Sequence, residues 1–249
     1  MEQINIIKIW SDSINEKNLE KIIKNAKIWE EKTKEKFIFI SSWAVKLWKD
    51  RVKEAWKNIE NFSKSALASI WQKYLMRQYQ EFLWKKELIW EILIDDFADE
   101  KHLAKTIENL LKNNVWIIIN YNDTLHSDEL NNVSEKSDND KNTVFVTKVL
   151  KKYLDIDIKR VIYLTNTNGL LDKNKKTVLG WKICLEKDRD YFKSFVEKNK
   201  SDSWTGWMES KLNCGFEVLE YWVWETIIAN ARDWCECLEG NGKYTRFIY

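Results

Sequence analysis

Two lysines in the chain could supply positive charge to a phosphate or carboxylate ligand. Lys8 interrupts the apolar run Ile4–Ile9 near the end of a predicted strand, and ligands of open α/β sheets bind at the carboxyl ends of strands. Lys211 follows a Ser-Trp-Thr-Gly-Trp-Met turn and falls in the first turn of a helix predicted to begin at Met208. Free backbone N–H groups at a helix start bind phosphate. Lys8 could instead be an edge lysine that reaches water, whereas a lysine that opposes the helix dipole favours function for Lys211.

Two clusters of Asp and Asn lie at places where ligands often bind. Asn120–Thr124 follows the predicted strand Val115–Ile119, and Ser137–Asp140 opens a predicted helix. Residues of these types also form turns and helix caps, so each cluster alone is equally compatible with a structural role. Their occurrence together with Lys8 and Lys211 favours an anion-binding site.

The remaining reactive side chains point to no other chemistry. His102 and His126 are too few and too isolated for a metal cluster or a catalytic triad, and we expect both to face solvent. We expect Cys214 to be a buried structural thiol. Cys235 and Cys237 are two positions apart, which fits neither a zinc pair nor a disulfide framework and indicates a reducing, cytoplasmic compartment.

The elements that must position these residues alternate along the chain. Strand-sized apolar runs alternate with amphipathic helical stretches, which predicts a three-layer α/β/α sandwich with a mostly parallel central sheet. We expect a single domain over residues 1–249 with no C-terminal accessory domain. The predicted strands are Ile4–Ile9, Phe37–Ser41, Ile89–Ile94, Val115–Ile119, Arg160–Thr165, Thr226–Asn230 and Thr245–Ile248. The predicted helices are Glu16–Glu31, Ile59–Lys85, Lys101–Lys112, Asn139–Leu154, Asp188–Glu197 and Met208–Tyr221.

Charge and hydropathy exclude several classes of partner. The 41 basic and 39 acidic side chains nearly cancel, so no global field would attract nucleic acid. The longest apolar runs are strand-sized and bounded by polar residues, so we expect no membrane span and no cleavable signal.

The tryptophan count is abnormal. The chain has 15 Trp but only 6 Gly and no Pro. Several tryptophans, such as Trp43, Trp204, Trp207 and Trp234, stand in turn-like contexts where small residues with free φ are expected.

Read with glycine at the tryptophan positions, the chain contains K-I-G-S, S-S-G-A-V-K-L-G, A-L-A-S-I-G-Q, I-D-D-F-A-D, N-Y-N-D-T, S-D-N-D and T-G-G-M-E-S-K in this order. This series resembles the glutamate 5-kinases of the amino acid kinase family over about Ile4 to Ile248. The resemblance implies ATP-dependent phosphorylation of the γ-carboxylate of L-glutamate to γ-glutamyl phosphate, the first step of proline biosynthesis. It also implies Mg²⁺ carried by the nucleotide, and a homo-oligomer is a fair expectation.

The resemblance further implies roles for individual residues. The catalytic residues would be Lys8, Asp140 and Lys211, with Asp140 orienting two lysines that neutralise the transferring phosphoryl group. The glutamate-binding residues would be Ser42, Asp123 and Asn139. The ATP-binding residues would be Lys8, Thr165, Asn166, Thr205, Gly206, Trp207, Met208 and Lys211.

The chain departs from the family pattern in ways that leave alternatives open. Asn166 stands where the family usually has Asp, and Ser137 stands where it usually has Gly. One alternative is another amino acid kinase, acting on acetylglutamate or a nucleoside monophosphate, from which Asp95–Asp99 and Asn120–Thr124 would distinguish this chain. The other is a non-catalytic glutamate sensor.

The tryptophans are the largest departure, because an indole does not fit the positive-φ backbone that glycine allows. Our hypothesis is that the gene reads UGA as glycine and that this chain was translated with UGA as tryptophan. Trp116 fits this hypothesis least well. UGG codons at Trp43 and Trp207 would refute it, and a degenerate, inactive paralogue is the alternative.

Overall fold

The computed structural model describes residues 2–9, 16–41, 63–83, 87–122, 139–170, 182–184, 188, 190 and 206–248. Within these residues, eight strands form one sheet in the order β3-β4-β2-β1-β5-β7-β8-β6. The strands are β1 (Gln3–Ile9), β2 (Lys36–Ser41), β3 (Ile89–Ile94), β4 (Trp116–Tyr121), β5 (Asp157–Thr165), β6 (Lys182–Cys184), β7 (Glu225–Asn230) and β8 (Tyr244–Ile248). The helices are α1 (Glu16–Thr33), α3 (Lys64–Phe82), α4 (Glu100–Lys112), α6 (Asn139–Tyr153), α8 (Gly206–Leu219) and α9 (Trp234–Leu238).

The sheet is mostly parallel, as the alternation of strands and helices predicted. Strand β1 pairs in parallel with β2 on one side and β5 on the other, and β5 continues in parallel to β7. Only the pair β7–β8 is antiparallel among the described strands. The carboxyl ends of β4, β2, β1, β5 and β7 therefore meet at one edge of the sheet.

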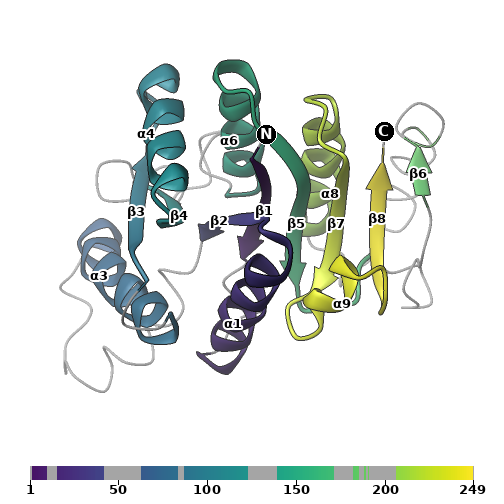
Figure 1. The fold of residues 1–249 in the computed structure, drawn as a ribbon, viewed down its shortest axis with the longest axis horizontal. Helices are drawn as coiled ribbons and strands as arrows, with labels where there is room; N and C mark the ends of the chain where they lie inside the picture. Colours follow the sequence, from purple (N-terminus) through teal and green to yellow (C-terminus); the bar gives the residue numbers. More distant parts are fainter. Residues whose placement is uncertain are drawn as a thin grey trace.

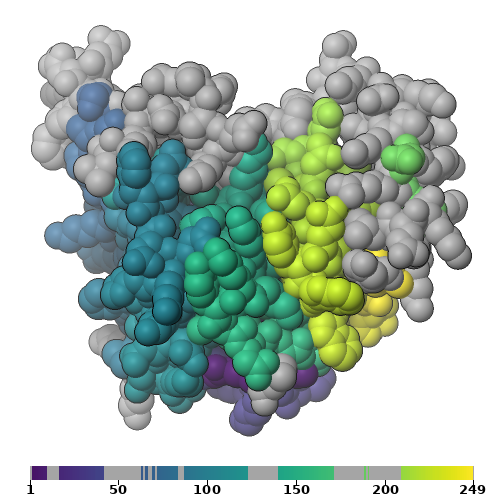
Figure 2. Space-filling view, turned by 90° about the horizontal axis from the view of Figure 1, so that it is seen from above, coloured from purple at the N-terminus to yellow at the C-terminus, as the bar shows by residue number. Residues whose placement is uncertain are grey.

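Helices cover both faces of this sheet. Helices α4, α6 and α8 pack on one face, and α1, α3 and α9 pack on the other (Figure 1). Figure 2 shows α4, α6 and α8 as adjoining columns across their face, in agreement with the contacts of α6 with both neighbours. The predicted three-layer α/β/α sandwich is confirmed.

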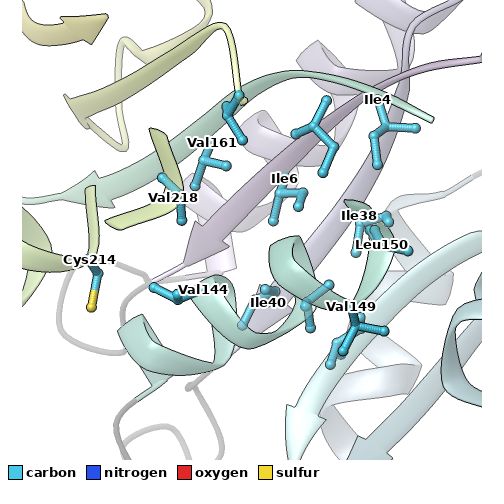
Figure 3. Packing of buried hydrophobic residues seen from close by; sticks show 14 of the residues in the cluster. Ile4, Ile6, Ile38, Ile40, Val144, Val149, Leu150, Val161, Cys214 and Val218 are labelled. Carbon is cyan, nitrogen blue, oxygen red and sulfur yellow. The ribbon is translucent and has the colours of Figure 1, made fainter. Parts of the chain in front are cut away.

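The core beneath α6 and α8 is aliphatic and tightly buried. Side chains of β1 and β2, including Ile6 and Ile40, point toward Val144 and Val149 of α6 (Figure 3). Each fully buried side chain of this kind contributes about 1.5–3 kcal/mol. Because successive strand residues alternate between faces, Lys8 lies on the same face as Ile6, the face that α6 and α8 cover.

The predicted elements agree with the described ones apart from ends and short segments. Helix α3 begins after Ser63, whose hydroxyl accepts a hydrogen bond from Ala66 N, so the predicted start at Ile59 is wrong. Helix α8 begins at Gly206 rather than Met208. Of the predicted helix Asp188–Glu197, Asp188 and Asp190 are helical and the rest lies outside the described residues. The short elements β6 and α9 were not predicted.

No helix in the described part of the chain is long and apolar enough to cross a membrane.

Candidate active site

The parallel strands β1 and β5 lie side by side in the middle of the sheet, and their carboxyl ends meet at one edge. Open α/β sheets bind ligands at the carboxyl ends of their strands. Lys8 and Thr165 lie near the ends of these two strands.

Three charged side chains, from β1, α6 and α8, meet near this edge of the sheet. Lys8 Nζ lies 2.6 Å from Asp140 Oδ1, and Lys211 Nζ lies 3.0 Å from Asp140 Oδ2. The exposed fraction is 2% for each lysine side chain and 0% for that of Asp140. We call Lys8, Asp140 and Lys211 the carboxyl-edge cluster.

The electrostatics of the carboxyl-edge cluster keep Asp140 ionised. Burial by itself raises the pKa of Asp140, but the charges and hydrogen bonds of Lys8 and Lys211 outweigh burial, so the pKa is lowered overall. Asp140 also lies in the first turn of α6, where the helix dipole favours a negative charge. The three charges sum to one positive charge, which suits an anionic ligand.

The structure shows the burial of Lys8 and the position of Lys211 in its helix. Lys8 is only 1% exposed, so the interpretation that it is an edge lysine reaching water is wrong. Because α8 begins at Gly206, Lys211 lies in the second turn of the helix rather than the first. From there its side chain reaches Asp140 on the neighbouring helix α6.

The loop that follows β5 begins at the same edge of the sheet. Thr165 is 3% exposed, and its hydroxyl accepts a hydrogen bond from Thr167 N at 3.1 Å and donates to Thr167 O at 2.8 Å. Asn166 is exposed, and its backbone oxygen accepts from Asn230 Nδ2 at 3.1 Å. Asn230 was not singled out from the sequence, although it ends a predicted strand at the same edge.

Several predicted site residues are described only in part. Ser42, Asp123 and Thr205 lie outside the described residues. For Asn139, Gly206, Trp207 and Met208 the structure describes the backbone, which forms the starts of α6 and α8. Both helix starts therefore belong to elements that carry the carboxyl-edge cluster.

Other predicted features have structural explanations. Asp99 caps α4 by accepting a hydrogen bond from His102 N at 2.9 Å, and Asp95 Oδ1 accepts from Phe97 N at 2.9 Å. His102 is exposed and Cys214 is buried, as predicted, whereas His126 lies outside the described residues.

The thiols and potential metal ligands add no second site. Cys214, Cys235 and Cys237 are free thiols. The described residues contain no group of three or more His, Cys, Asp or Glu side chains that could hold a metal ion.

Sequence comparison connects the chain with glutamate 5-kinases, although no protein-family model matches it. A glutamate 5-kinase of Desulfotalea psychrophila is 38% identical over 117 residues, which cover 45% of this chain and 28% of the relative. One of Enterococcus faecalis is 27% identical over 197 residues, 74% of this chain and 70% of the relative. One of Listeria innocua is 28% identical, and the match covers 41% of its length.

Solved structures share the fold over the whole chain. Carbamate kinase from Giardia lamblia bound to AMP-PNP has a TM-score of 0.67 at 12% identity, covering 99% of this chain and 98% of that one. An isopentenyl phosphate kinase substrate complex has a TM-score of 0.58 at 10% identity, covering 99% of both chains. N-acetylglutamate synthase from Neisseria gonorrhoeae has a TM-score of 0.61 at 11% identity, covering 100% of this chain and 59% of that one. The chain therefore has the amino acid kinase fold.

Proposed function

We propose that this chain is a phosphotransferase that moves the γ-phosphoryl group of ATP to the γ-carboxylate of L-glutamate. The observation that carries the proposal is the carboxyl-edge cluster, in which two buried lysines share one carboxylate near the carboxyl ends of the strands. The names of the sequence relatives support glutamate as the acceptor, and the fold shared with a kinase bound to AMP-PNP supports the nucleotide.

In this proposal the two lysines stabilise the negative charge of the phosphoryl group that is transferred. Phosphoryl transfer is catalysed mainly by positioning and by electrostatic stabilisation of the equatorial oxygens. The ammonium groups of Lys8 and Lys211 neutralise the charge of the transferring group, while Asp140 holds both of them in place. In the same proposal, the backbone N–H groups at the start of α8, from Gly206 onward, bind phosphate oxygens.

The acceptor explains why the cluster contains no free base. A glutamate side chain has a pKa of about 4.3 and is already ionised at neutral pH, so no proton has to be removed before it attacks phosphorus. The lowered pKa of Asp140 fits this reaction, because Asp140 is required as a fixed negative charge and not as a proton acceptor. No covalent enzyme intermediate is needed.

The remaining roles are proposals from the family resemblance. Thr165 and Asn166 line the nucleotide side together with residues 205–208, and Ser42, Asp123 and Asn139 bind glutamate. Mg²⁺ enters as a ligand of the nucleotide phosphates and supplies further charge neutralisation there. We also propose that residues 1–249 act as one domain in a homo-oligomer.

The tryptophan question bears directly on activity. Trp222 follows α8 with a φ of 60° and is 70% exposed, a backbone conformation that is costly for a bulky residue and natural for glycine. This supports glycine as the intended residue there. Trp116 and Trp234 instead are buried, at 5% and 0% exposure.

The test is hydroxamate formation from glutamate, Mg-ATP and hydroxylamine. It compares the chain as written with a chain in which all tryptophans are changed to glycine, and with Lys211→Met in the glycine chain as a matched control. Activity of the glycine chain alone, abolished by Lys211→Met, is the expected result and supports both the kinase and the codon hypothesis.

A panel of acceptors separates the alternatives. Turnover with acetylglutamate or a nucleoside monophosphate, but not with glutamate, would mean that the chain is another kinase of this fold with a different acceptor. Glutamate binding without turnover of any acceptor by the glycine chain would overturn the kinase proposal in favour of a sensor.

A further inference from the structure

Asn230 is the last residue of β7 and lies beside Thr165, the last residue of β5, in the parallel register of the two strands. Both strands end at the edge of the sheet where Lys8 meets Asp140. Asn230 is therefore next to the loop Thr165–Leu170, whose first two residues, Thr165 and Asn166, the proposed function assigns to the nucleotide.

The side chain of Asn230 uses both of its polar atoms on neighbouring backbone and side-chain groups. Nδ2 donates to the backbone oxygen of Asn166 at 3.1 Å and to Asn168 Oδ1 at 2.9 Å. Oδ1 accepts from the backbone N–H of Arg232 at 3.0 Å. The carbonyl of Asn166 needs a donor and the N–H of Arg232 needs an acceptor. Only one of the two possible orientations of the Asn230 side-chain amide gives each of them its partner.

The rest of the loop is held at both ends. At its start, the Thr165 hydroxyl accepts from Thr167 N at 3.1 Å. At its end, Leu170 N donates to Thr245 Oγ1 at 2.9 Å. Gly169 has a φ of +98°, and a Cβ there would lie 2.6 Å from Thr245 Oγ1, so the close approach to β8 requires glycine. Asn230 adds a connection from β7 to the middle of this loop.

The sheet does not need Asn230 to join β5 and β7. The two strands are paired from Arg160 to Thr165, and Ala231 N donates to Thr165 O at 2.9 Å beyond the last paired residue. The two hydrogen bonds from Asn230 Nδ2 therefore act on the loop and not on the strand pairing.

We propose that Asn230 is a positioning residue for the nucleotide. Its amide sets the orientation of the peptide between Asn166 and Thr167, and through this peptide it sets the side of the loop that faces the nucleotide. A loop that is already ordered avoids the entropic cost of ordering on binding, so nucleotide affinity depends on this amide. The inference rests on the proposed function of the loop.

The test compares Asn230→Asp with Asn241→Asp, which adds the same charge at an exposed asparagine after α9. In Asn230→Asp a carboxylate oxygen faces the Asn166 carbonyl, which is part of the backbone and cannot turn into a donor. Calorimetric titration with AMP-PNP measures nucleotide binding without requiring turnover. It is run on the chain as written and on the glycine chain, together with the KM of each substrate and the melting temperature.

We expect Asn230→Asp to raise the dissociation constant for AMP-PNP about tenfold, because the Asn166 carbonyl loses its donor and faces a carboxylate oxygen instead. The KM for glutamate should stay within about twofold, and Asn241→Asp should match the unmodified chain. Asn168→Asp keeps an acceptor for Nδ2 and should bind normally, whereas Asn168→Asp combined with Asn230→Asp should bind more weakly than Asn230→Asp alone.

Unchanged AMP-PNP binding by Asn230→Asp would overturn this inference but not the proposed function. The same holds if Asn230→Asp weakens the binding of AMP-PNP and of glutamate equally and lowers the melting temperature, because that result marks a merely structural residue. Failure of both unmodified chains to bind AMP-PNP would overturn the proposed function and this inference together.

Discussion

Two buried charged clusters lie at opposite edges of the sheet, and they differ in how their charges are used. The carboxyl-edge cluster has two ammonium groups on one carboxylate. The second, which we call the amino-edge cluster, consists of Asn5, Trp29, Glu35, Lys159, Arg160, Glu225 and Arg246. Its members come from β1, α1, β5, β7, β8 and the segment before β2.

In the amino-edge cluster, the central carboxylate is surrounded by donors. Glu35 accepts from Asn5 Nδ2 at 3.0 Å, Trp29 Nε1 at 2.8 Å, Arg160 at 2.9 Å and Lys159 Nζ at 2.7 Å. Burial by itself raises the pKa of Glu35, but the hydrogen bonds from Lys159, Asn5 and Trp29 and the charge of Arg160 lower it to about 2.

The two clusters also differ in their access to water. In the amino-edge cluster, Lys159 and Arg246 remain 26% and 29% exposed, so the positive charges there are partly solvated. In the carboxyl-edge cluster, Lys8 and Lys211 are each 2% exposed. Burying two cations beside one anion costs free energy, and this cost supports the proposal that the carboxyl edge binds an anion.

The largest expected effect comes from Asp140→Asn in the carboxyl-edge cluster. The amide keeps the shape of the side chain but leaves two buried ammonium groups without their shared charge, so the lysines lose their fixed positions. We expect kcat to fall by about 10²–10³. Steady-state hydroxamate assays on protein whose folding is checked by circular dichroism measure this. A variant with normal kcat would mean that the two clusters do not differ in function.

The amino-edge counterpart is Glu35→Gln, which replaces an acceptor of four hydrogen bonds by a group that accepts with one end only. We expect a loss of about 3 kcal/mol in the free energy of unfolding at pH 7, with kcat of the folded enzyme unchanged. Urea denaturation and the hydroxamate assay separate the two quantities.

The pH dependence of Glu35→Gln sharpens the result. Because the folded-state pKa of Glu35 is lowered to about 2 from 4.5, its stabilisation is complete above pH 4.5 and is lost as the pH falls toward about 2. The stability difference between wild type and Glu35→Gln should therefore shrink between pH 4.5 and about 2. A constant difference over this range would contradict the assignment.

Glu91 of β3 is a partly buried carboxyl group with the opposite pKa shift. Its Oε1 has no hydrogen-bond partner in the described structure, and burial raises its pKa from 4.5 to about 7. The folded chain therefore keeps a proton that the unfolded chain releases, so wild-type stability falls as the pH rises from 4.5 to about 7 and stays lower above it.

Glu91→Gln should remove this loss and stabilise the chain on the order of 2 kcal/mol at pH 8, with little effect near pH 4.5. Urea denaturation at both pH values measures it. The matched control is Glu81→Gln, at a 56% exposed side chain of α3, which should change neither value appreciably. Equal behaviour of the two variants would mean that burial does not govern Glu91.

The smallest effect is expected at Trp222, which belongs to neither cluster. Trp222→Gly should raise the free energy of unfolding by about 1 kcal/mol, since glycine adopts a positive φ without the steric cost of a side chain. Trp224→Gly is the control, because Trp224 is also exposed, at 62%, but donates from Nε1 to Asp157 at 2.8 Å. In thermal unfolding, Trp222→Gly should melt at a higher temperature than the parent chain and Trp224→Gly at a lower one. The kcat of both variants should be unchanged.

The sequence predicted the carboxyl-edge cluster better than the amino-edge cluster. Lys8, Asp140 and Lys211 stand in recognisable local patterns at a strand end and at helix starts. Asn5 is a polar residue in an apolar strand, whereas Arg160 and Glu225 lie at or near the starts of theirs, and only the register of β1, β5 and β7 makes the three neighbours. Such a register is a property of the whole sheet and leaves no signal in any one segment.

The same distinction explains the errors in the fold. Long periodic segments were located well because their burial pattern repeats several times. Helix α9 has five residues and β6 has three, too few for either period to show. The roles of all the predicted site residues stay predictions, and Ser42, Asp123 and Thr205 also lie outside the described residues.

The residues of the carboxyl-edge cluster are synthesised at very different times, because they lie far apart in the sequence. Strand β1 is synthesised before the other described strands, yet its partner on one side, β5, ends at Thr165, and the last member of the carboxyl-edge cluster is Lys211. At about 5–20 residues per second, roughly ten seconds or more of translation separate Lys8 from Lys211. A nascent chain therefore cannot assemble the carboxyl-edge cluster until Lys211 has left the ribosome.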